Sequence, residues 1–581
     1  MGKQFPFFLF HNKGLSFSSS NFKGGYNMKC MKLLILFLFT TTLLLSEETE
    51  YNHFSFSDTV SPDAFFERLF IDYASLSGGE LDSLGDMTVF GVPHYQDKMK
   101  DLSDEAQAKY FAMLKAALKK IHTFDLDSLD TQTRYNLETV GWFLENKVEG
   151  ERFSYHEAIL APLIGFEGEI YDIFLNQIVI ETVEDAQDFI ARMAYVEKKT
   201  NQVIAIFEES INRGMLMNTS SIRAAMNTLY DLRMGASYSK TYTGYKRQVN
   251  LLNIPSEEKK KLLDEALKGM NTYFVPSMNR LYKTLQNAIS LPNRESGVWY
   301  YPEGDAYYRY ALKTNTTLDL DPEALHEFGK GEVEKIRNRI VELRSLIGGN
   351  TSINTEESIM EYMDDLFYPE FQPEYLPEIE IFYANMYTPP RIDGKTKGIF
   401  YSTTGNKEEN SLYFHEVVPG HHLERTYNLR LETMPMIRHM CFFTAYIEGW
   451  ALYAERLAWE TMKEDKLKRE LDYLQNLLLR AKRIVADTGI NYKRWTRQQT
   501  VDYMLEDGFS RDLIESDVNR YITWPGQACA YYVGYTKLME LRKLMEEKCG
   551  EDFDLREFHK LILENGQMPL EILEKKFLES F

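Results

Sequence analysis

The sequence predicts a mainly α-helical protein with a small β-sheet. Three stretches, 103–121, 183–207 and 322–347, carry apolar residues at three- and four-residue spacing, as helices with one buried face do. Only two short stretches favour strands: residues 378–383 alternate in polarity, and residues 398–401 follow after a turn. The 581-residue chain is 44% hydrophobic and 14% aromatic, so it can bury a large core. We therefore expect a large helical fold with a small sheet next to the helix that carries the chemistry.

The N-terminus has the pattern of a signal peptide. Residues 28–46 begin with a basic stretch and continue in a 13-residue apolar run, which is shorter than a membrane-spanning helix. Residues 1–27 lack this pattern, so Met28 or Met31 is an alternative start. With Met1 as the start, the apolar run would instead be a signal anchor. We expect a secreted or extracytoplasmic protein with no stable membrane partner beyond such an N-terminal anchor.

Charge and cysteine content exclude several kinds of partner and site. The net charge is −21, from 87 acidic and 66 basic residues, whereas nucleic acids and anionic membranes are bound by basic surfaces. Outside the leader the chain has only Cys441, Cys529 and Cys549, with no Cys-x-x-Cys pair. We therefore expect no nucleic-acid partner, no disulfide framework and no thiolate metal site.

The most informative motif is His-Glu-Val-Val-Pro-Gly-His-His at residues 415–422, which holds three of the chain's 11 histidines. Neutral imidazoles are common zinc ligands, and a neighbouring carboxylate can act as general base, as in the His-Glu-x-x-His metallopeptidases. The bare His-Glu pairs at 156–157 and 326–327 have no further histidine nearby. We therefore expect His415 as a metal ligand and Glu416 as the base. The alternative is a polar loop that happens to collect histidines.

The Pro419-Gly420 insertion decides which histidine is the second ligand. Ligands four residues apart on a helix face one metal, whereas His421 lies six residues after His415 and His422 seven. Proline interrupts a helix, so the chain must kink or bulge here. Looping out Pro419-Gly420 restores the working spacing for His421. We expect His421 as the ligand and His422 near the substrate or behind the ligands, with the reverse assignment left open.

A third ligand is predicted on the amphipathic stretch 446–457, where Glu448 and Glu455 share a helix face. This stretch resembles the Asn-Glu-Gly-Phe-Ala helix of the gluzincin peptidases, in which the glutamate before the glycine binds zinc. The resemblance implies Glu448 as the third zinc ligand and Glu455 as a carboxylate that holds a histidine ring. The alternative is an ordinary helix with solvated acids.

A tyrosine is predicted to assist the reaction. Gln527, Tyr531 and Tyr535 lie four apart, on one face of a helix that begins after Pro525-Gly526. A tyrosine hydroxyl can stabilise the negative oxygen that develops during amide hydrolysis. Tyr531 is the first candidate and Tyr535 the second, with Gln527 towards the substrate. The alternative is an aromatic packing stripe.

Together these motifs resemble the family catalogued as domain of unknown function 885, a gluzincin-like group of zinc-dependent peptidases. Its pattern combines the motif at 415–422, Glu-Gly-Trp-Ala-x-Tyr-x-Glu at 448–455, and a Pro-Gly-Gln-Ala segment at 525–528. The resemblance extends from about residue 60 to the C-terminus and implies a helical metallopeptidase fold. Tyr532 departs from the pattern, because many relatives have lysine there.

The sequence thus predicts a zinc-dependent hydrolase of short peptides, with a leader at 1–46, a helical region at 47–295 and a catalytic region at 296–581. One alternative is a zinc-dependent amidase acting on a non-peptide or modified amide. Another is a non-catalytic, metal-binding exported protein, although retention of a base beside the ligands disfavours it. The arginines that could bind a substrate carboxylate are not ranked by the sequence: Arg391, Arg520 and Arg542.

Overall fold

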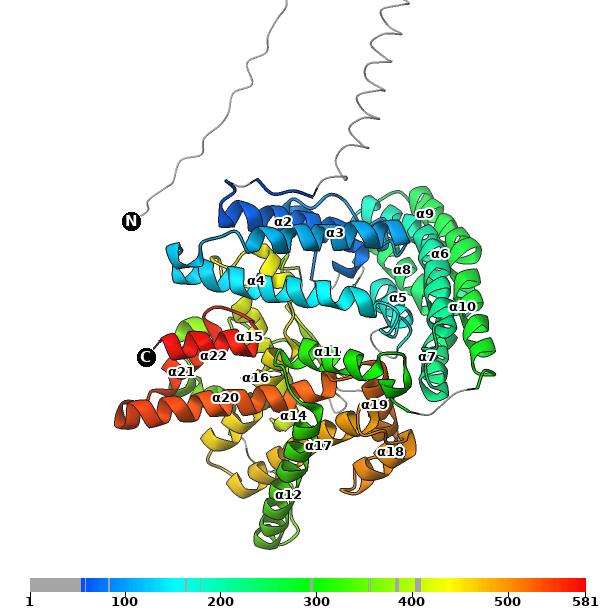
Figure 1. Ribbon diagram of the computed structural model, residues 1–581. Helices are drawn as coiled ribbons and strands as arrows, with labels where there is room; N and C mark the ends of the chain where they lie inside the picture. Colours follow the sequence, from blue (N-terminus) through cyan, green and yellow to red (C-terminus); the bar gives the residue numbers. More distant parts are fainter. Residues whose placement is uncertain are drawn as a thin grey trace, which may run out of the picture. The chain divides into compact units, whose positions relative to one another are not determined.

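The computed structural model describes residues 54–580 with short gaps (Figure 1). The residues inside this range that it does not describe are 58, 82–83, 162–164, 178, 293–295, 354, 356, 382–385, 396 and 403–408. Residues Ser55–Phe581 form one compact unit. The expected division near residue 295 stays a prediction, and the predicted leader lies outside the described residues.

The described part is mainly helical, as the sequence predicts. The α-helices are α2 (Pro62–Ser77), α3 (Asp104–Ile121), α4 (Thr131–Gly150), α5 (Phe166–Tyr171), α6 (Val183–Asn212), α7 (Thr219–Leu232), α8 (Lys240–Leu251), α9 (Ser256–Gly269), α10 (Val275–Ala288), α11 (Gly304–Thr316), α12 (Pro322–Ile347), α13 (Met363–Leu366), α14 (Ser411–Glu416), α15 (His421–Asn428), α16 (Thr444–Thr461), α17 (Lys466–Asn491), α18 (Arg497–Leu505), α19 (Arg511–Thr523), α20 (Gln527–Cys549), α21 (Leu555–Leu563) and α22 (Leu570–Glu579). None of the helices in the described part is long and apolar enough to cross a membrane.

Helix ends follow local capping chemistry, which is why the three predicted helices are found close to their expected bounds. The Ser103 side chain accepts a hydrogen bond from the backbone at the start of α3, and Thr182 forms a capping box with Asp185 at the start of α6. Helix α12 begins with Pro322 in its first turn and ends at Gly348, whose φ of 70° suits glycine.

A three-stranded sheet lies beside the helices of the central motif. Strands β1 (Glu378–Ile381) and β3 (Ile399–Ser402) are parallel, and β2 (Met386–Thr388) pairs antiparallel with β3. The order is β1-β3-β2. The sequence indicates β1 and β3 but not β2, because three residues are too few to show alternation. The Phe400 ring on β3 contacts Tyr413 on α14, with ring centroids 6.3 Å apart, so the sheet lies next to this helix.

The buried side chains gather in several clusters along the chain. One cluster lies within residues 99–288 and is built mainly by α6 to α10. A second lies within 479–528 and packs α17 against α18, α19 and the start of α20. A third joins Phe153 and Met215 to the aromatic residues of α11. The second cluster includes Ala528 and so holds the start of α20, the helix that carries Gln527, Tyr531 and Tyr535.

Candidate metal centre

The 415–422 motif forms two short helices instead of one kinked helix. Helix α14 ends at Glu416, α15 begins at His421, and the Val418-Pro419 bond between them is cis. Gly420 is required here, because a Cβ would lie 1.9 Å from the His415 carbonyl oxygen. The Trp450 indole of α16 donates a 3.0 Å hydrogen bond to the Pro419 carbonyl and holds the break against α16.

Two glycines bring α16 close to α20 and so set the position of the acidic face of α16. A Cβ on Gly449 would lie 2.5 Å from the backbone of Gly534, and one on Gly534 would lie 1.8 Å from the Ala445 carbonyl oxygen. Only glycine permits this approach of the two backbones. The approach places Glu448 of α16 near Tyr531 of α20, and the negative charge of Glu448 adds to burial in raising the pKa of Tyr531.

The structure brings the three predicted ligands together. Glu448 Oε2 lies 3.4 Å from His415 Nε2 and 3.5 Å from His421 Nε2, and the three ligand atoms lie within 4.8 Å of one another. Ligands of a tetrahedral zinc ion, at about 2.0–2.2 Å from the metal, lie about 3.3–3.6 Å apart. Glu448 Oε2 is also buried without a hydrogen-bond partner in the described part of the chain. The three groups therefore fit a divalent metal.

A buried carboxylate orients the first histidine. The Nδ1–H of His415 donates a 2.9 Å hydrogen bond to Glu455, whose side chain is fully buried, and this leaves Nε2 directed at the cluster. Burial by itself lowers the pKa of His415, but Glu448 and Glu455 outweigh it and raise the pKa to about 9. A carboxylate behind a histidine ligand is the usual support of a zinc site.

The second histidine of the pair, His422, points elsewhere. Its Nε2–H donates to the Tyr375 carbonyl at 2.7 Å, and its Nδ1 accepts from the Tyr387 hydroxyl at 2.8 Å. Burial lowers its pKa to about 4, so the ring is neutral. His422 thus ties α15 to strand β2, while His421 faces Glu448. Between the two assignments left open by the sequence, the geometry favours His421 as the ligand.

The two tyrosines of α20 have different surroundings. The Tyr531 ring is stacked with His415, with centroids 6.3 Å apart, whereas the Tyr535 hydroxyl is hydrogen-bonded to Tyr473 at 2.8 Å and to Arg456 at 3.0 Å. The structure therefore leaves Tyr531 as the tyrosine beside the cluster and gives Tyr535 a packing role. The buried Gln527 side chain interacts with Tyr531, and its Oε1 has no hydrogen-bond partner among the described residues.

Glu416, the predicted base, follows His415 directly at the end of α14. It is half-buried, and it has no hydrogen-bond partner in the part of the chain that the structure describes. Its negative charge contributes to the raised pKa of His415. Glu416 therefore lies close enough to the cluster for its charge to act on His415.

A family model described as a bacterial protein of unknown function matches residues 86–380 and 374–577, most of the chain. The chain belongs to the domain of unknown function 885 family. No curated protein matches it.

Two solved structures share the fold with this member of the domain of unknown function 885 family. One, from Colwellia psychrerythraea, is called a "putative lipoprotein"; it is 24% identical, with a TM-score of 0.82 over 90% of this chain and 99% of that one. The other, from Shewanella oneidensis, is called a "putative lipoprotein of unknown function". It is 16% identical, with a TM-score of 0.67, and the match covers 90% of this chain and 100% of that one.

Sequence reasoning did not find a second polar cluster next to Tyr531. Arg483 on α17 forms a 2.9 Å ion pair with Asp517 on α19, and its guanidinium lies 5.1 Å from the centre of the Tyr531 ring. Arg520 shares Asp517 at 3.9 Å. In the sequence these residues appear only as charged positions on amphipathic helices. That pattern does not show which charged residues pair with one another.

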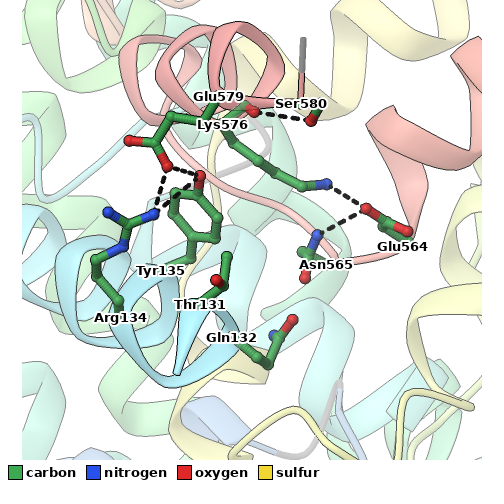
Figure 2. A pocket seen from close by; sticks show the side chains of 9 residues that line it. All are labelled: Thr131, Gln132, Arg134, Tyr135, Glu564, Asn565, Lys576, Glu579 and Ser580. Atoms are coloured by element: carbon green, nitrogen blue, oxygen red, sulfur yellow. Dashed lines mark hydrogen bonds and ion pairs between the residues drawn. The ribbon is translucent and has the colours of Figure 1, made fainter. Parts of the chain in front are cut away.

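A hollow of about 430 Å³ lies between α4 and the C-terminal helices and shares no residue with the cluster of His415, His421 and Glu448 (Figure 2). Its charged groups are already paired: Arg134 and Tyr135 with Glu579, and Lys576 with Glu564. A polar hollow with paired charges has no group left to direct a reaction. The cluster of His415, His421 and Glu448 is therefore the candidate site.

Proposed function

We propose that this protein is a zinc-dependent peptidase that acts on short peptides. The observation that supports this proposal is the convergence of His415 Nε2, His421 Nε2 and Glu448 Oε2, with Glu455 hydrogen-bonded behind His415. In the described part of the chain only three such side chains converge, as in catalytic zinc sites; a structural site takes four.

The chemistry divides among a few side chains. A bound zinc ion would supply Lewis-acid chemistry, making water more acidic and polarising a carbonyl group. Glu416 takes the proton of the attacking water and delivers it to the departing amine nitrogen as the C–N bond breaks. The water oxygen remains on the carbonyl carbon, which becomes a carboxylate. The Tyr531 hydroxyl donates to the carbonyl oxygen as negative charge develops on it.

The polarity of the site at rest agrees with this division of roles. Glu416, Glu448 and Glu455 place three carboxylates around two imidazoles, so the cluster attracts a cation. Burial and the charge of Glu448 raise the pKa of Tyr531, so its hydroxyl keeps its proton and remains a donor. The same groups would serve an amidase acting on non-peptide amides, and the products of defined substrates separate the two functions.

We also propose that the protein acts outside the cytoplasm. The signal-peptide pattern at residues 28–46 supports export. The names of the two solved structures with the same fold point in the same direction, because lipoproteins are exported proteins.

Metal analysis and a digest test the proposed function. The purified protein should carry about one zinc per chain and should cleave peptides in a defined mixture, with products read by mass. Glu416→Gln should keep the zinc and lose hydrolysis, because it removes the base and no ligand. Absence of any transition metal, with none taken up on addition, would contradict the proposal, and so would unchanged hydrolysis by Glu416→Gln.

A further inference from the structure

We propose that Arg520 binds the free C-terminal carboxylate of the peptide, so that the protein removes short C-terminal pieces. This inference rests on the proposed function and names its substrate class: peptides with a free carboxyl end within about three residues of the cleaved bond.

The structure ranks the three arginines that the sequence leaves equal. Arg391 is paired with Asp393 at 3.0 Å, and Arg542 with Glu460 at 2.7 Å. Arg520, by contrast, lies 3.9 Å from its nearest carboxylate, and its Nε and Nη2 atoms are buried without a hydrogen-bond partner among the described residues. A guanidinium has five donors that match a carboxylate in a two-bond fork. Of these three arginines, we therefore assign the carboxylate to Arg520, whose Nε and Nη2 donors are not used within the described part of the chain.

The carboxylate next to Arg520 is committed to other partners. Asp517 accepts hydrogen bonds from Arg483 at 2.9 and 3.2 Å and from the Tyr521 hydroxyl at 2.9 Å. Two arginines thus share this carboxylate, and a second acid near Arg520 is Asp487. A largely buried guanidinium whose charge is only partly compensated favours an anionic ligand.

A nearby acid, Asp487, compensates Arg520 only in part, because burial raises the pKa of Asp487 to about 7 and leaves it partly protonated at neutral pH. Its carboxylate is buried, and it accepts hydrogen bonds from the Tyr308 hydroxyl at 2.8 Å and from the Gly526 N–H at 3.0 Å. These donors belong to α11 and to the start of α20. Asp487 and Arg520 are not an ion pair within 4 Å in the described structure.

Tyr531 connects the arginine cluster to the metal-binding cluster. Its ring centre lies 5.1 Å from the guanidinium of Arg483, which shares Asp517 with Arg520, and 6.3 Å from the ring centre of His415. An extended peptide advances about 3.3–3.6 Å per residue, so about three residues cover this path. The Gln527 Oε1, buried without a partner in the described part, lies on the same helix and can accept a substrate N–H. A carboxylate at Arg520 therefore belongs to a residue just beyond the cleaved bond.

The test uses one mixed-sequence pentapeptide library prepared in two forms, as free acids and as C-terminal amides. The zinc-loaded protein should shorten the free acids by one to three C-terminal residues. The amides should react about a hundredfold more slowly, because they cannot pair with the guanidinium. Equal cleavage of both forms would overturn the inference and leave the proposed function standing.

Two variants assign the preference to Arg520. Arg520→Gln should raise KM for free acids about a hundredfold and leave amide cleavage unchanged, and Arg520→Lys should restore part of the preference because it keeps the charge. Arg542→Gln, in which the altered arginine is one already paired, should retain the full preference. A preference that survives both Arg520 variants would overturn the inference.

A binding measurement separates this inference from the proposed function. Calorimetric titration of Glu416→Gln with the two libraries should show tighter binding of free acids, and the added Arg520→Gln change should abolish the difference. If no peptide is hydrolysed but this pattern is found, the carboxylate site stands and the peptidase proposal fails. Equal binding of acids and amides by Glu416→Gln would overturn the carboxylate site.

Discussion

His415 and Glu455 are joined by a 2.9 Å hydrogen bond from Nδ1 to a fully buried carboxylate, forty residues apart in the chain. This bond fixes the ring so that its other nitrogen faces His421 and Glu448. The arrangement explains why a carboxylate lies seven residues after Glu448 on the same face of α16.

Glu455→Gln should weaken zinc binding, because an amide holds the imidazole less firmly than a carboxylate. We expect a loss of about 10- to 100-fold in affinity, measured by competition with a chelator. Glu460→Gln is the matched control on α16, since Glu460 is bonded to Arg456 and Arg542 instead of to a ligand. Equal zinc affinity of the wild type and Glu455→Gln would show that the bond does not support the site.

His421→Ala and His422→Ala should have different effects. His421→Ala should remove tight zinc binding, because it deletes one of three converging ligands. His422→Ala should keep the metal but lower turnover and Tm, because it breaks the bonds to Tyr375 and Tyr387. Metal content and thermal unfolding of both variants check this. Loss of zinc from His422→Ala alone would mean that the ligand assignment is reversed.

Tyr531→Phe should lower kcat and kcat/KM together by about a hundredfold, because the hydroxyl acts only on charge that develops in the transition state. Tyr535→Phe is the matched change one turn away. It loses hydrogen bonds to Tyr473 and Arg456, so it should lower the free energy of unfolding by about 1 kcal/mol with little effect on rate. If Tyr531→Phe slows hydrolysis only a few-fold, the donor lies elsewhere.

Asp487 should make stability depend on pH. Burial outweighs its hydrogen bonds and raises its pKa from 3.8 to about 7. Between these values the folded state binds more protons than the unfolded state, so the free energy of unfolding falls as pH rises from about 4 to about 7. Asp487→Asn should remove this part of the slope, as measured by urea unfolding at a series of pH values. Identical slopes for both proteins would contradict the assignment.

Gly534→Ala should destabilise the protein by about 1–3 kcal/mol and weaken zinc binding, because its Cβ would collide with Ala445 and push α16 from α20. Gly244→Ala in α8 is the matched control. A Cβ there meets nothing within 4 Å, so helix propensity should make it neutral or stabilising. Chemical unfolding and chelator competition measure both effects. A harmless Gly534→Ala would mean that the close helix approach is not required.

The sequence by itself determined the features that depend on local chemistry. Helical periodicity and capping residues predicted α3, α6 and α12, because a helix end is decided within one turn. The spacing of Glu448 and Glu455 predicted that both lie on one face of α16, since a helix repeats regularly. The same periodicity favoured a mainly α-helical fold, and the structure confirms it.

Tertiary structure decided what depends on residues far apart in the chain. Helix α14 ends at Glu416, so helical periodicity does not say where His421 and His422 point. The contact of the Pro419 carbonyl with Trp450 on α16 holds the break in place, and His421 then faces Glu448. Tyr531 and Tyr535 are equivalent by spacing, yet their neighbours on other helices separate them. The cluster around Asp517 has no sequence pattern either, because its members lie on different helices and only folding brings their charges together.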